Sequence, residues 1–116
     1  MRVIKKYPNR RLYDAVASRY VTLGDIRQLV LDEIPFQVVD RSTDENITRA
    51  ILLRVIAEQE QRGPAMLSES FLSQVICAYR SSTAVLVSEH LERSLAQLLG
   101  PRRDGGGANR NEPAGA

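Results

Sequence analysis

The segment KKYPNRRLYD, residues 5–14, concentrates the side chains of this sequence that are best suited to bind a polyanion. It holds four cations and two tyrosines in ten residues. Cations that neutralise the phosphates of duplex DNA gain affinity by releasing condensed counterions. An arginine can also bond both major-groove acceptors of guanine, and an asparagine can bond adenine in the same two-point way. The candidate DNA-binding residues are Lys5, Lys6, Tyr7, Asn9, Arg10, Arg11, Tyr13 and Arg19.

Charge is strongly segregated along the chain. The formal net charge is +2, but residues 1–20 hold six cations and one anion, whereas residues 21–60 hold four arginines and eight acids. This segregation is typical of a protein with a polyanionic partner, and the alternative is a basic surface that only solvates the protein. Because the segments that look helical are not cationic, a β-ribbon or basic arm is favoured over a helix-turn-helix as the element that enters the groove.

Length and composition argue against other classes of function. A chain of 116 residues is short for an enzyme with a deep cleft, and one cysteine and one histidine exclude an internal disulfide and most zinc sites. Cys77 and His90 are separated by roughly 20 Å along one predicted helix, so they do not form a catalytic pair. We expect no enzyme activity, no catalytic residue, no metal site and no cofactor. No stretch resembles a membrane span or a signal peptide, so a cytoplasmic protein without a membrane partner is expected.

A short β-ribbon must hold the basic segment in place. The β-prone runs RVIKKY, RRLYD and RYVTL, at residues 2–7, 10–14 and 19–23, predict two or three strands. FQVVD, at residues 36–40, predicts another strand. Since an isolated ribbon is only marginally stable, we expect it to pack on the helices that follow.

Three helix starts follow one pattern. Thr22, Thr48 and Ser68 each stand where a hydroxyl can accept a bond from an unpaired backbone N–H. An apolar residue precedes each of these caps, and another follows four residues later, as in a hydrophobic staple. The predicted helices cover about residues 23–33, 49–61 and 69–99. The second is apolar over more than one stripe, which indicates more than one covering surface.

The third predicted helix is long enough to suggest oligomerisation. At 1.5 Å per residue it would extend roughly 45 Å, more than a domain of this size can cover. The alternative is a bend at Ser81 and Ser82 that folds the two halves into a hairpin. The expected oligomer-interface residues are Leu72, Val75, Ile76, Tyr79, Leu86, Leu91 and Leu95.

The string KYPNRRLYD is long and unusual in composition, and with the segments that follow it the sequence resembles the polyhydroxyalkanoate synthesis repressor family over residues 2–99. The resemblance implies a bacterial transcription regulator with an N-terminal DNA-binding domain and a short accumulation-regulator domain. Family members repress genes for phasins, the proteins that coat storage granules, and often their own gene. They also bind the polyester, and this binding is thought to release them from DNA.

Together these observations predict an α+β protein in which short N-terminal strands pack with two helices and a long C-terminal helix forms a dimer or tetramer. The expected division is a DNA-binding domain at 1–62, a helical regulatory domain for polyhydroxybutyrate accumulation at 65–100 and a disordered tail at 101–116. The expected partners are an operator in duplex DNA, the polymer and further copies of the chain, in the nucleoid and at the granule surface. The alternative function is a structural protein of the granule surface. RNA binding is disfavoured because only Tyr7 and Tyr13 lie near the basic segment.

Overall fold

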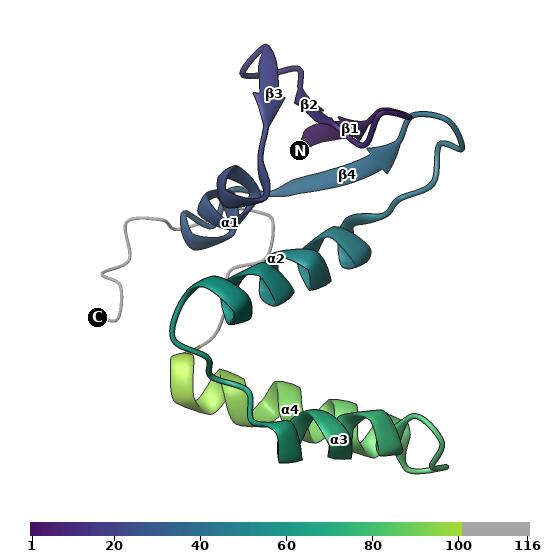
Figure 1. The fold of residues 1–116 in the computed structure, drawn as a ribbon, viewed down its shortest axis with the longest axis vertical. Helices are drawn as coiled ribbons and strands as arrows, with labels where there is room; N and C mark the ends of the chain where they lie inside the picture. Colours follow the sequence, from purple (N-terminus) through teal and green to yellow (C-terminus); the bar gives the residue numbers. More distant parts are fainter. Residues whose placement is uncertain (101–116) are drawn as a thin grey trace.

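The computed structural model describes residues 1–100, and the predicted tail lies outside the described residues. Four strands and four helices follow one another, in an α+β arrangement that confirms the predicted class (Figure 1). The elements are β1 (Arg2–Lys6), β2 (Leu12–Asp14), β3 (Arg19–Val21), α1 (Leu23–Leu31), β4 (Phe36–Asp40), α2 (Thr48–Arg62), α3 (Glu69–Ala78) and α4 (Ala84–Leu99).

The basic segment belongs to a four-stranded sheet with the order β3-β2-β1-β4. Strands β1, β2 and β3 form an antiparallel meander, and β4 joins β1 in parallel through the crossover helix α1. β1 is therefore an inner strand with a neighbour on each side. A basic arm that is free of the sheet is excluded by this pairing, and the predicted ribbon is confirmed.

One face of the sheet is covered by α1 and α2 (Figure 1). The buried core joins the inward-facing side chains of the sheet to those of the two helices, because alternate residues of a strand point to the same face. Its fully or nearly buried members are Ile4, Leu12, Val38, Ile26, Leu29 and Ile51. The intervening residues of β1, β2 and β3, which alternate with the buried ones, point to the other face of the sheet, and α1 and α2 leave that face open.

Two of the three predicted helix caps are confirmed. Thr22 and Asp25 form a reciprocal capping box at the start of α1, and the hydroxyl of Ser68 accepts the N–H of Phe71 at the start of α3. The predicted cap at Thr48 is wrong, because α2 begins at Thr48 itself. The Thr48 hydroxyl instead accepts the N–H of Val38, 2.9 Å away, and so ties α2 to β4.

The predicted continuous helix over residues 69–99 is wrong. Helix α3 ends at Ala78 and α4 starts at Ala84, and α4 runs in the opposite direction to α3 (Figure 1). The Ser81 hydroxyl accepts the N–H of Thr83 at 2.9 Å, which is the competition with helical bonding expected of serine. The alternative of a hairpin bent at Ser81 and Ser82 is the one observed, and Cys77 and His90 consequently lie on different helices.

The described residues hold neither a helix capable of crossing a membrane nor a group of three potential metal ligands. In α2 the second apolar stripe is uncovered, since Leu53 is 63% and Ile56 50% exposed. This agrees with the prediction that α2 has more apolar surface than its own domain covers.

Candidate nucleic-acid interface

The turn between β1 and β2 carries Asn9, Arg10 and Arg11. The N–H of Tyr7 donates to the Arg11 carbonyl at 2.9 Å, and the N–H of Arg10 donates to the Tyr7 carbonyl at 2.8 Å. Arg10 has a φ of 69°, in the left-handed region. These features match a three-residue hairpin loop, whose left-handed position is usually glycine. An arginine at this position presents a guanidinium at the tip of the ribbon at the expense of backbone strain.

Asn9 helps to shape this turn. Its side-chain oxygen accepts the N–H of Arg11 at 3.0 Å, and its amide nitrogen carries two further donors on an exposed residue. Reading an adenine with both ends of the amide would require this oxygen as well. The role of Asn9 in base recognition therefore stays a prediction, beside a structural role in fixing the loop.

Three tyrosines form a row across the open face of the sheet. Tyr13 faces Tyr20 in the neighbouring strand, with ring centroids 5.4 Å apart at 76°. Tyr7 continues the row at 6.4 Å and 73° from Tyr13. Edge-to-face contacts of this kind fix the rings relative to one another. The expectation that only Tyr7 and Tyr13 lie near the basic segment is wrong, because β3 brings in Tyr20.

Cations border the tyrosine row. The Arg11 guanidinium carbon lies 3.9 Å from the Tyr20 ring centroid, and that of Arg41 lies 5.8 Å from the Tyr7 ring centroid. Lys5 is paired with Tyr13 in the sheet register and is exposed on the same face. A guanidinium stacked on a ring keeps its N–H donors at the edge available for an acceptor such as phosphate. The open face thus combines cations with rigid aromatic rings.

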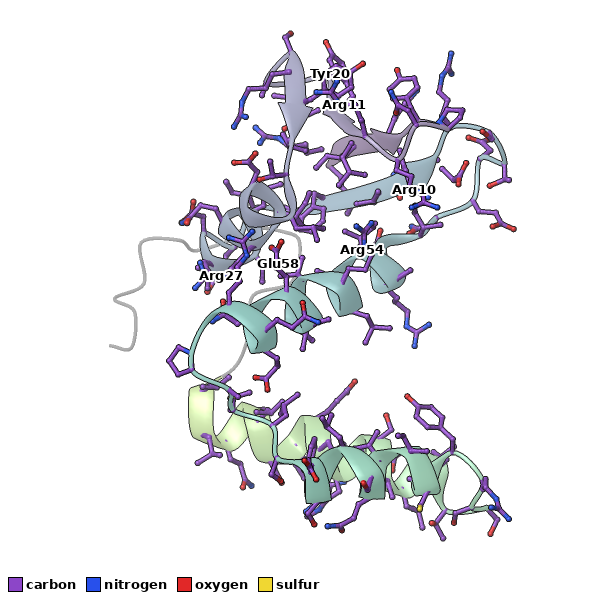
Figure 2. All side chains as sticks on the ribbon, in the orientation of Figure 1. Arg10, Arg11, Tyr20, Arg27, Arg54 and Glu58 are labelled. Carbon is purple, nitrogen blue, oxygen red and sulfur yellow. The ribbon has the colours of Figure 1, made fainter. Side chains whose placement is uncertain are left out.

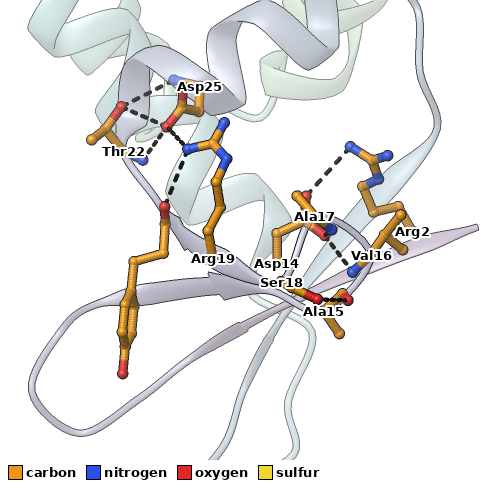
Figure 3. A network of polar contacts seen from close by, with 10 residues as sticks. Arg2, Asp14, Ala15, Val16, Ala17, Ser18, Arg19, Thr22 and Asp25 are labelled. Atoms are coloured by element: carbon orange, nitrogen blue, oxygen red, sulfur yellow. Dashed lines mark hydrogen bonds and ion pairs between the residues drawn. The ribbon is translucent and has the colours of Figure 1, made fainter.

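The six cations of residues 1–20 divide into two groups. Arg2 pairs with Asp14 at 3.3 Å, and Arg19 pairs with Asp25 at 3.5 Å (Figure 3). The other four, which are Lys5, Lys6, Arg10 and Arg11, make no ion pair with any described residue. Of these, Lys6 is half-buried with its side chain on the helix-covered side of the sheet, and the remaining three are exposed. The structure therefore brings most of the predicted cations to the turn and the open face.

Arg19 is committed to the start of α1. The backbone N–H of Thr22 is the main cause that holds the pKa of Asp25 below its ordinary value of 3.8; partial burial opposes this, and the Thr22 hydroxyl and Arg19 add to it. The Arg19 guanidinium also donates to the Tyr20 carbonyl at 3.3 Å. Its predicted role in DNA contact would compete with these bonds.

Asp14 holds the turn between β2 and β3 (Figure 3). Its buried carboxylate accepts the N–H of Val16 at 2.9 Å and that of Ala17 at 3.2 Å, and it pairs with Arg2. A buried carboxylate with three partners is a strong local constraint. This turn carries β3, and with it Tyr20, back alongside β2.

Sequence reasoning missed Tyr20 and Arg41. Tyr20 could have been found from strand alternation, because a tight β2–β3 hairpin places it opposite Tyr13. Arg41 follows β4 and reaches Tyr7 only because β4 pairs in parallel with β1, so no local pattern signals it.

The sequence of this chain is similar to one protein family and to two proteins named below. Residues 3–63, which span the sheet, α1 and α2, match a family described as the PHB/PHA accumulation regulator DNA-binding domain. A protein of Thiocystis violacea named "Uncharacterized protein in phbA 5'region" is 48% identical over 103 residues, covering 89% of this chain and 75% of that protein. An uncharacterized protein of Allochromatium vinosum is 47% identical over 94 residues, covering 81% of this chain and 61% of that protein. No solved structure matches the chain.

Proposed function

The chain belongs to the family of PHB/PHA accumulation regulator DNA-binding domains, and on that premise we propose that it represses polyhydroxyalkanoate storage genes and leaves DNA when it binds the polymer. The targets are the phasin gene and the gene of the protein itself. The observation that carries the proposal is the exposed set of Lys5, Arg10 and Arg11, which lack acidic partners among the described residues and lie beside the tyrosine row.

In this proposal the β1–β2 ribbon, rather than a helix, contacts the duplex. Lys5 and Arg11 hold phosphates from the open face, and Lys6 reaches phosphate from the side of the ribbon. Arg10 in the turn holds a phosphate, and the Asn9 amide beside it contacts a base edge. Tyr7 and Tyr13 keep the ribbon rigid and bond phosphate through their hydroxyls. A two-stranded β-ribbon can enter the major groove of B-DNA; here the turn at residues 7–11 lies beyond the residues that pair with β3 and β4.

Control of storage genes is supported by the name of a relative. The Thiocystis violacea protein is described by its place in the region 5' to phbA. The family match of this chain and the location of its relative near phbA both fit a role in transcription of storage genes. We extend the role to this chain because the two sequences share 48% identity over most of both lengths.

We further propose that residues 1–62 bind DNA and that residues 65–100 serve assembly and polymer contact. Large apolar side chains lie exposed on α3 and α4, with Ile76 68% and Leu86 64% exposed. Exposed apolar surface of this extent marks an interaction site. The proposed interface residues are Leu72, Val75, Ile76, Tyr79, Leu86, Leu91 and Leu95, of which Val75 and Leu91 are half-buried. A two-fold dimer, or a tetramer built from it, predicts a palindromic operator.

Polymer binding is assigned to the same helical segment. A polyester surface is apolar with ester carbonyls, and an amphipathic helix adsorbs to such a surface as it does to a lipid interface. Contact with the polymer and contact between subunits then draw on the same apolar side chains. This shared use explains how polymer could weaken assembly and so release the operator.

Binding of the full chain to a duplex from the phasin promoter, measured by fluorescence anisotropy across salt concentrations, tests the proposal. If Lys5, Lys6, Arg10 and Arg11 each neutralise one phosphate, the log–log slope should be about −4 per protomer. Changing Arg10 and Arg11 to alanine together should reduce the slope to about −2. A matched loss of two charges, at Arg80 and Arg93 in the helical segment, should leave it unchanged. A slope near zero in the unmodified chain would refute the DNA contact proposed here.

The alternative is a structural protein of the granule surface, favoured by the exposed apolar side chains of α3 and α4. Binding to isolated granules, with and without operator DNA, separates the two functions. Operator DNA should reduce granule binding by a releasable repressor. It should have no effect on a structural protein, whose basic segment only solvates the surface.

A further inference from the structure

A hollow of about 350 Å³ opens between the β1–β2 turn, the end of β3 and helix α2. It is lined by three arginines, Arg10, Arg11 and Arg54, together with Tyr20, Thr22 and aliphatic side chains of the core. Within residues 1–100, no acidic residue lines it. Figure 2 shows Arg10 and Arg54 in the space between the sheet and α2, with Arg11 beside Tyr20.

Arg54 is free to face this hollow because its neighbours on α2 are otherwise engaged. Glu58 follows Arg54 by one helical turn and could pair with it. Instead, a Glu58 carboxylate oxygen lies 3.7 Å from a guanidinium nitrogen of Arg62, and Arg54 has no ion pair with a described residue. Arginines from two separate elements therefore line the hollow, and no acidic residue among the described ones lines it.

Such an arrangement suits a phosphate group. Guanidinium forks bind phosphate oxygens with two parallel bonds, and several cations around one small space repel each other until an anion neutralises them. A volume of this order falls within the usual range of sites for small ligands. Arg10 adds a second reason, because its strained left-handed backbone is the kind of feature that gathers at ligand-contacting sites.

We propose that this hollow binds a phosphate group through Arg54 together with Arg10, while Arg11 stays stacked on Tyr20 at its border. The phosphate is either a phosphodiester of duplex DNA or part of a free phosphorylated small molecule. The first case rests on the proposed function and adds α2 to the DNA-contacting surface, although the acids of that helix argued against it at the sequence level. The second case stands independently of DNA binding.

The test compares Arg54→Gln with Arg49→Gln in the full chain. Both changes remove one charge from α2, but five residues along a helix turn the side chain by about 140° onto another face. Each variant is measured against duplex DNA across salt and against pyrophosphate, followed by amide chemical shifts at Arg10, Arg11 and Arg54. A phosphate contact predicts that Arg54→Gln weakens one of these ligands about tenfold, whereas Arg49→Gln does not.

The outcomes separate the two sources. Weaker DNA binding with a salt slope smaller by about 1 identifies a DNA phosphate. Unchanged DNA binding with lost pyrophosphate binding identifies a free phosphorylated ligand. If Arg54→Gln equals Arg49→Gln for both ligands, the inference is overturned, even where the unmodified chain binds DNA well. If the unmodified chain binds no duplex, the proposed function fails, and the pyrophosphate comparison still decides the hollow. Arg54→Lys, which keeps the charge but loses the fork, should retain the slope and lose affinity.

Discussion

Replacing Arg10 with glycine should stabilise the fold while it weakens binding to DNA. Arg10 has a φ of 69°, and the left-handed conformation costs a residue with a side chain about 1–2 kcal/mol. Glycine removes this cost, but it adds conformational freedom to the unfolded chain that is worth about 0.5–1 kcal/mol. The net expectation is a gain of about 0.5–1 kcal/mol in the free energy of unfolding. For a domain of this size that corresponds to about 3–6 °C in melting temperature.

Urea unfolding and thermal melts of the full chain measure the stability side, and anisotropy with operator DNA measures the binding side. Two further variants isolate the causes. Arg10→Ala loses the guanidinium without relieving the backbone, so it should bind DNA as weakly as the glycine variant without gaining stability. Arg10→Asn, a residue that tolerates the left-handed region, should fall between them in stability. Equal stability of the glycine and alanine variants would refute the argument that strain at this turn is retained for the sake of the arginine.

The remaining predictions concern the turn after β2, the start of α1 and the helical segment. Asp14→Ala should lower the free energy of unfolding by about 2–3 kcal/mol in urea titrations, because it removes a buried carboxylate and its bonds. Arg2 is 27% exposed and can be hydrated again, which limits the loss. A loss below about 1 kcal/mol would contradict this. Since the pKa of Asp25 is lowered on folding, its stabilising effect should be complete above about pH 4 and disappear as the pH falls through the folded pKa. Urea midpoints at pH 5 and pH 3 should therefore differ more in the unmodified chain than in Asp25→Asn. Ile76→Glu should reduce the assembled mass measured by sedimentation without unfolding the chain, and an unchanged mass would exclude this face of α3 from the subunit interface.

Local patterns predicted the parts of the structure that are stabilised locally. The capping box of Thr22 and Asp25 needs only a hydroxyl and a carboxylate three residues apart, and the strands need only short β-prone runs between turn residues. Thr48 shares with Thr22 only the hydroxyl and the flanking apolar residues, since Ile51 stands where Thr22 has Asp25, and its hydroxyl bonds to Val38 of β4, ten residues earlier in the chain. A tertiary contact of this kind overrides a local preference and leaves no trace in the pattern.

The sequence predicted the site residues that lie in the β1–β2 segment. It missed those that the fold brings there from other segments. Lys5, Arg10 and Arg11 stand out because they are close together in the sequence. Arg41 and Arg54 reach the same region only through the parallel pairing of β4 and the packing of α2, and each looks unremarkable in a segment rich in acids. The break between α3 and α4 was also hard to see, because apolar residues keep their helical spacing across Ser81 and Ser82 and only the hydroxyl bonds reveal the turn.

The position of β1 inside the sheet has a consequence for biosynthesis. Of the four strands of the sheet, β1 leaves the ribosome first, and its parallel partner follows 34 residues later, since Arg2 pairs with Phe36. The meander alone offers few contacts, so the basic ribbon gains its final shape only after β4 has emerged and α1 has closed the crossover. A nascent chain arrested before that point would carry the positive charges without the rigid surface that presents them. The rigid presentation of the basic turn is thus delayed until β4 and α1 are in place.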